Sequence, residues 1–157
     1  MIEPEVAELL ESPCALIVGT VDASGIPDAT RGWGLRVEPD GVHVRLLLSS
    51  NAAVTLANLG TTARLALTAT DVATLYSVQI KGRASNVEAP TGEDIDRFER
   101  FCVEVVHRIA EVTGENTEII VRLKPPGVVA CTVRVDEVFD QTPGPSAGAC
   151  LAPVESP

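Results

Sequence analysis

Residues 14–48 read CALIVGTVDASGIPDATRGWGLRVEPDGVHVRLLL, and this stretch decides the fold. It divides into three runs rich in β-branched and other apolar residues, at 14–22, 28–37 and 42–48. Turn-forming residues separate the runs, namely Ala23-Ser24-Gly25-Ile26-Pro27 and Pro39-Asp40-Gly41. In the third run apolar residues recur with the period of two that is typical of a half-buried strand. We therefore expect three consecutive antiparallel strands.

The rest of the chain is expected to supply further strands and the helices. One long helix is indicated by an apolar spacing of three and four residues from Ile95 to Val112, by a capping box at Thr91 and Asp94, and by Gly114 at its end. Short helices are expected at residues 3–11 and 52–59, the second stopped by Gly60. The other expected strands are 63–70, 75–88 with a bend at Gly82, 118–123 and 127–139. This pattern predicts an all-antiparallel barrel of six or seven strands with helices at its rim.

A single domain, residues 1–139, is expected to precede a Pro/Gly-rich tail, residues 140–157. The chain has 157 residues, which fits one domain because domains cluster around roughly 100–150 residues. The tail holds four prolines and two glycines, so we expect no regular structure there. It either drapes over the domain or a partner subunit, or stays disordered.

The charge of the chain excludes some classes of partner. Its 12 Lys and Arg against 22 Asp and Glu give a net charge of −10, which argues against nucleic acid and anionic membranes. Four widely spaced cysteines indicate reduced thiols rather than a disulfide framework. The first twelve residues contain four Glu and no basic residue, unlike a targeting segment. We expect a cytoplasmic protein that crosses no membrane.

Neither histidine predicts a metal site or a nucleophilic triad. His107 lies between Glu104 and Glu111 on the expected long helix, but all three positions fall opposite the apolar stripe and face solvent. His43 stands alone on a strand, and nothing ties either histidine to a candidate nucleophile. We expect no bound metal.

Basic residues on the expected strands point to an anionic ligand. Ser49-Ser50-Asn51 stands at the start of the second short helix, and helix N-termini with hydroxyl groups bind phosphate. The alternative is that outward-facing strand arginines only serve solubility. Trp33 beside Gly32 and Gly34 is either a stacking wall for a flat ligand or a core residue. The strand-borne cations are Arg31, Arg36, Arg45, Arg64, Lys81 and Arg83.

The order of these motifs resembles the pyridoxamine 5'-phosphate oxidase-like family of FMN-binding split barrels. Three stretches carry the resemblance: ALIVGTVDASGIPDAT at 15–30, DGVHVRLLLSSNAAVTLANL at 40–59 and VQIKGRA at 78–84. The resemblance implies a mainly β, six-stranded antiparallel split barrel with Greek-key character, flanked by one long and one or two short helices. It also implies a homodimer that binds FMN at the subunit interface and acts on a small-molecule redox substrate, with the flavin carrying the redox chemistry.

The same resemblance assigns cofactor contacts position by position. Those to the flavin ring and ribityl chain fall on Thr30, Arg31, Gly32 and Trp33. Phosphate contacts fall on Ser49, Ser50 and Asn51, with Arg45 as a guanidinium partner. The strand with Gln79 and Lys81 would approach the cofactor from the neighbouring side.

Two departures from the family leave alternatives open. Members that grip the phosphate firmly carry Lys or Arg shortly after the hydroxyl pair, where this chain has Ala52, Ala53 and Val54. The chain ends in FDQTPGPSAGACLAP, without the Trp and Arg by which the oxidases hold pyridoxal phosphate. We therefore expect a flavin-dependent oxidoreductase of unknown substrate. The alternatives are a non-catalytic module that binds or senses flavin, deazaflavin or haem on the same fold, and a purely structural dimerisation protein.

Overall fold

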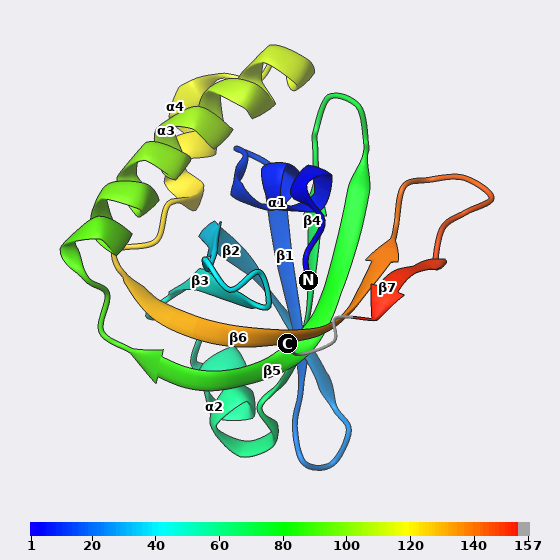
Figure 1. Cartoon of the computed structure of the whole chain (residues 1–157). Coiled ribbons are helices and arrows are strands. Elements are labelled where there is room, and N and C mark those ends of the chain that lie inside the picture. Colours follow the sequence, from blue (N-terminus) through cyan, green and yellow to red (C-terminus); the bar gives the residue numbers. More distant parts are fainter. Residues whose placement is uncertain (154–157) are drawn as a thin grey trace.

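Seven β-strands form one antiparallel sheet that closes on itself in the computed structural model, which describes residues 1–153 (Figure 1). The sheet order is β3-β2-β1-β4-β5-β6-β7, and pairing of β3 with β6 closes the first six strands into a barrel. The order 3-2-1-4 is a Greek key, so the predicted six-stranded split barrel with Greek-key character is confirmed. The strands are β1 (Ala15–Val21), β2 (Pro27–Val37), β3 (His43–Ser49), β4 (Arg64–Thr70), β5 (Ser77–Glu88), β6 (Val128–Asp140) and β7 (Cys150–Pro153).

Helices flank the barrel on three sides (Figure 1). Helices α1 (Pro4–Glu11) and α2 (Ala53–Thr62) lie at opposite ends of the barrel, and the long α3 (Gly92–Thr113) runs along one side with α4 (Thr117–Ile120). Both predicted ends of α3 are confirmed. Thr91 and Asp94 form a reciprocal capping box, and Gly114 ends the helix with φ +72°.

The described residues contain no helix long and apolar enough to span a bilayer. The helices instead contribute apolar faces to the core, as the buried side chains of Leu10 in α1 and Phe98 in α3 show.

The core inside the barrel is aliphatic, and two glycines are needed where the chain packs too tightly for a side chain. A Cβ on Gly32 would lie 2.9 Å from the Leu16 Cβ, so β2 crosses the core only because this position lacks one. A Cβ on Gly82 would lie 2.1 Å from the Arg134 carbonyl oxygen. Gly82 also sits at a register shift between β5 and β6, which confirms the predicted bend.

The prediction of a strand at 118–123 is wrong, because this run forms α4 and the 3-10 helix η1 (Val121–Leu123). The Asn116 side chain caps α4 by accepting a hydrogen bond from the Glu118 N–H at 2.9 Å. Pairing of β3 with residues 128–134 of β6 occupies the part of β6 that directly follows this run along the chain. Strand β3 also differs from its prediction: Val44 to Leu48 are all buried, and the side chain of Arg45 is held by Asp94 of α3.

Two further boundaries differ from prediction. Helix α2 continues through Gly60 to Thr62 and ends at Ala63, which adopts φ +57°. The tail is not free of regular structure, because Cys150–Pro153 returns as β7 on the outside of β6. Strand β7 lies at the edge of the sheet, where proline is tolerated. The last part of the predicted tail, residues 154–157, lies outside the described residues.

Candidate functional site

One row of side chains crosses five strands on the outer surface of the barrel. Cross-strand pairing joins, from β2 to β6, the residues Arg31, Ile17, Thr68, Gln79 and Phe139. Paired residues share a face, so all five project outward. Ile17, the second residue of the row, is 43% exposed, and Gln79 Nε2 donates a hydrogen bond to Thr68 Oγ1 at 3.0 Å. We call this surface the open face.

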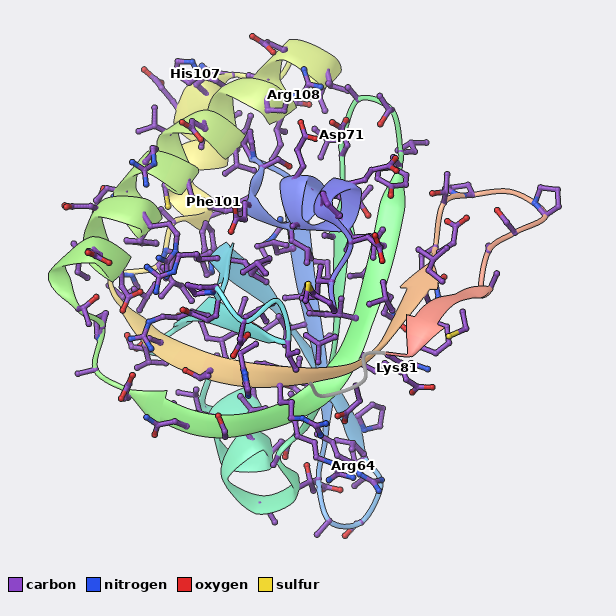
Figure 2. All side chains as sticks on the ribbon, in the orientation of Figure 1. Arg64, Asp71, Lys81, Phe101, His107 and Arg108 are labelled. Carbon is purple, nitrogen blue, oxygen red and sulfur yellow. The ribbon has the colours of Figure 1, made fainter. Side chains whose placement is uncertain are left out.

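Small residues form the floor beside this row. The next cross-strand line runs from Ala29 through Gly19 and Ala66 to Lys81, so three neighbouring positions have at most a methyl group. Lys81 lies on the open side of the barrel, away from α1 and α3 (Figure 2). Its Nζ stands 4.3 Å from the centre of the Phe139 ring. A flat floor edged by cations suits a flat anionic ligand.

The hydroxyl-rich segment reaches the same row at its β2 end. Arg31 precedes Gly32, which pairs with Leu48, so the antiparallel register sets Arg31 across from Ser49. Ser50 is fixed by the Gly127 carbonyl, which accepts hydrogen bonds from its N–H at 3.0 Å and from its Oγ at 3.2 Å.

The sequence places Ser49-Ser50-Asn51 at the start of the second short helix, but none of these side chains caps α2. The N-cap of α2 is Ala52, and no side chain caps it. Ser49 Oγ instead accepts a hydrogen bond from the Asn51 N–H at 3.2 Å. Asn51 itself is exposed at the end of this turn.

The predicted contacts from β2 divide between the two sides of the sheet. Thr30 pairs with the buried Val18, and Gly32 packs against Leu16, so both face the barrel interior. Arg31 and Trp33 face outward. Trp33 is 8% exposed and meets the Phe98 ring edge-on at 6.4 Å, so it is mostly a packing residue. The open face receives only Arg31 of these four as a side chain.

Arg45 does not join the candidate site. Its Nη2 lies 2.7 Å from Asp94 Oδ2, its Nε 3.0 Å from both Asp94 oxygens, and its Nη1 2.8 Å from Glu88 Oε1. These hydrogen bonds, those to Asp94 first, raise the pKa of Arg45. The assignment of Arg45 as a phosphate partner is therefore corrected: its guanidinium ties β3 to the start of α3.

Asp94 is the centre of that buried ionic cluster. Burial opposes its ionisation, but hydrogen bonds from Arg45, from the backbone and hydroxyl of Thr91 and from Arg97 outweigh burial. They hold the pKa of Asp94 well below its usual range. The sequence identified Asp94 only as a cap, because its pairing with Arg45 joins residues 49 positions apart.

An apolar groove adjoins the open face. It lies between α3-α4-η1 on one side and, on the other, the start of β1 and the middle of β2. Its volume is about 330 Å³. Trp33 and Phe101 form aromatic walls, and Phe101 projects from α3 toward the barrel (Figure 2). Arg31 lies at the groove as well as on the open face, so the two regions share a residue. The sequence did not predict this groove, because residues 118–123 were expected to be a strand.

Two cysteines line the groove as neutral thiols. Burial raises the pKa of Cys14 and of Cys102 to about 11. Among residues 1–153 no cluster of His, Cys, Asp and Glu has the arrangement of a metal site. His107 is exposed, as its position opposite the apolar stripe predicted.

Comparisons with known proteins agree with the fold. The chain resembles HupZ of Group A Streptococcus (TM-score 0.57, 18% identity, 94% of this chain and 100% of that one). It also resembles an F420 reductase (TM-score 0.56, 18% identity, 83% and 93%). A third similar structure is a putative pyridoxamine 5'-phosphate oxidase from Lactobacillus delbrueckii (TM-score 0.55, 18% identity, 88% and 93%). No curated protein sequence matches the chain.

A sequence profile assigns the family. The profile described as pyridoxamine 5'-phosphate oxidase matches residues 2–133, which include the six barrel strands to the middle of β6 and all of α3. The match extends well beyond residues 12–88, where the motifs lie. The barrel order, the open face and this match lead to one conclusion: the chain belongs to the pyridoxamine 5'-phosphate oxidase family.

Proposed function

We propose that this protein is an FMN-binding oxidoreductase that acts as a homodimer on a small-molecule redox substrate. The observation that carries the proposal is the open face, where Arg31, Thr68 and Gln79 stand in one row beside a floor of small residues. Arg31 and Lys81 form no ion pair within the described part of the chain, although acids outnumber bases almost two to one. Cations left unpaired on such a chain favour an anionic ligand.

The residues present fit a flavin mononucleotide. Arg31 and the hydroxyls of Ser49 and Ser50 hold the phosphate, and the small residues at Gly19 and Ala66 leave room for a flat ring. The side-chain amide of Gln79 can turn from Thr68 to hydrogen-bond a ring edge. When bound, the flavin supplies the electron-transfer chemistry, and these residues supply position and charge.

The homodimer follows from the apolar character of the same surface. Ile17 is exposed and Phe139 half-buried in the middle of a flat sheet face, where a second copy of the chain would remove them from water. A dimer would also enclose the cofactor between two open faces. Size-exclusion elution at twice the mass of one chain supports this, and elution as a monomer with bound flavin contradicts it.

The phosphate assignment is tested by replacing Arg31 with Gln and measuring the affinity for FMN and for riboflavin. Loss of a charge-assisted hydrogen bond costs about 1.5–3 kcal/mol, so FMN affinity is expected to fall about tenfold to a hundredfold. Riboflavin lacks the phosphate, and its affinity should stay unchanged. Arg100→Gln on the exposed surface of α3 is the matched control. Equal losses for both ligands would contradict the assignment.

Two other outcomes are separated by the absorption spectrum of the freshly purified protein. A deazaflavin is supported by the structural likeness to an F420 reductase, and its spectrum lacks the long-wavelength band of oxidised flavin. A Soret band would instead assign haem. A colourless protein that fails to bind added FMN contradicts the cofactor proposal as a whole.

A non-catalytic flavin module is the second candidate, and one observation favours it. Ala52 and Ala53 follow the hydroxyl pair, so no cation reinforces the phosphate at the start of α2. This candidate predicts weak FMN binding and no turnover. Oxidation of reduced nicotinamide in the presence of added FMN, above the rate of free FMN, would contradict it.

A further inference from the structure

Apart from Arg31 at its rim, the apolar groove beside the open face contains none of the residues that hold the proposed flavin. We propose that this groove binds a small, uncharged, apolar molecule. The binding does not rest on the proposed function, because the walls of the groove are complete without a cofactor.

The inside of the groove and its rim differ in polarity. Each buried residue that lines it is apolar or a neutral thiol, including Trp33, Phe101, Val105 and Ile120. The charged residues that line it, Arg31, Glu118 and Lys124 among them, are all exposed. A charged group placed inside would lose its hydration without gaining a partner, so the groove selects against charge.

Exposed apolar side chains surround the mouth of the groove. Val103, Val121 and Leu123 line it, and each is between 49% and 59% exposed. Large apolar side chains that gather around a hollow indicate a binding surface, because scattered ones need no such explanation. The volume of about 330 Å³ is within the range of small-molecule pockets.

The groove also lies apart from the floor assigned to the flavin ring. The segment Arg31-Gly32-Trp33 borders it, and Arg31 also belongs to the row that crosses the open face. Because Arg31 is assigned to the flavin phosphate, a molecule in the groove would lie beside the phosphate end of the flavin. Gly19 and Ala66, which form the floor for the ring, do not line the groove.

The chain carries its own reporter for the experiment. Trp33 is the only tryptophan, and it lines the groove. We expect 2-methyl-1,4-naphthoquinone, an uncharged apolar quinone, to quench its fluorescence in a saturable manner in cofactor-free protein. The anionic 1,4-naphthoquinone-2-sulfonate should bind at least tenfold more weakly. Free N-acetyltryptophanamide corrects for collisional quenching and light absorption by the quinones.

Two variants of the same segment locate the binding. Leu123→Asp places a charge in the groove, whereas Ile119→Asp places the same charge on α4 at an exposed position outside the lining. The affinity for the uncharged quinone should fall at least tenfold in the first variant and less than twofold in the second. Circular dichroism of both variants checks that each is folded.

Several results would overturn the proposal. These are quenching that does not saturate, equal affinity for the two quinones, or equal effects of the two variants. A change of elution volume in Leu123→Asp alone would assign the groove to a subunit interface instead. Failure of the quinone experiment leaves FMN binding standing, and failure of FMN binding leaves the quinone experiment valid, so the two proposals fail separately.

Discussion

In two places an arginine lies opposite another arginine on the neighbouring strand, and the two pairs differ in the carboxylates around them. Arg36 on β2 pairs with Arg45 on β3, under the start of α3, whereas Arg64 on β4 pairs with Arg83 on β5, on the open side. Around the first pair, Arg36 reaches Glu38 at 3.0 Å and Glu93 at 3.2 Å, and Arg45 reaches Asp94 and Glu88. Around the second, Arg83 reaches Asp136 only at 3.9 Å, and Arg64 has no ion pair within residues 1–153.

The difference separates charges that hold the fold from charges that remain available. Like charges directly opposite each other on a sheet destabilise it unless carboxylates compensate them. The covered pair is compensated and is therefore structural. The open pair borders a hollow of about 520 Å³ with Lys81, where Arg64 and Lys81 project from the barrel (Figure 2). A bound anion would compensate this second pair as the acids compensate the first.

Removing the central acid of the covered pair should have the largest effect on stability. Asp94→Asn leaves the guanidinium groups of Arg45 and Arg97 next to a neutral amide, with the site 1% exposed. Breaking a buried ion pair by removing one partner costs about 3–5 kcal/mol. Urea unfolding followed by circular dichroism measures this loss.

The matched control for Asp94→Asn is Glu93→Gln, one position earlier. The Glu93 side chain is 82% exposed, although it also pairs with an arginine. Exposed ion pairs contribute little, so we expect a loss of no more than about 1 kcal/mol. Comparable losses in the two variants would show that the Asp94 cluster is not the structural one.

The acid limb of the stability curve tests the same cluster without a large structural change. Because the pKa of Asp94 is lower in the folded protein than the unfolded value of about 3.9, the folded state favours the ionised form. Its contribution is complete well above pH 4 and is lost as pH falls through that value toward the folded pKa. The unfolding free energies of the wild type and Asp94→Asn should therefore begin to approach each other as the pH falls from about 5 to about 3, and continue to do so at lower pH. Parallel curves over that range would contradict this.

Local signals in the sequence predicted most of the architecture. The turns at 23–27 and 39–41, the long helix and its Thr91–Asp94 cap, and the bend at Gly82 depend on residues close together in the chain, and the structure confirms them. The prediction of a strand at 118–123 was wrong because the pattern of apolar and charged residues there fits a strand as well as a helix. The structure shows a helix there, begun by the Asn116 cap, while β3 pairs with β6 instead.

The candidate site was predicted as a set of cations but not as an arrangement. The register aligns Arg31 with Gln79, and this alignment requires the pairing of four strands. Arg45 on β3 is an arginine like Arg31 on the neighbouring β2. No local feature of the sequence shows that Arg45 pairs with Asp94, which lies far along the chain. The charge of a residue can be read from the sequence, but whether an opposite charge pairs with it depends on the tertiary fold.

The smallest predicted effect, and the most direct contrast between the two pairs, comes from reversing one charge in each. Arg64→Glu turns a like-charge cross-strand pair into an opposite-charge pair, so the unfolding free energy should rise by about 0.2–1 kcal/mol. Arg36→Glu replaces the partner of Glu38 and Glu93 by a third acid. The unfolding free energy should therefore fall by a similar amount. Urea unfolding at low salt and again at about 1 M salt measures both changes, and screening should shrink them together. A loss of stability in Arg64→Glu would mean that this arginine already has a partner in solution, and that the open pair is as structural as the covered one.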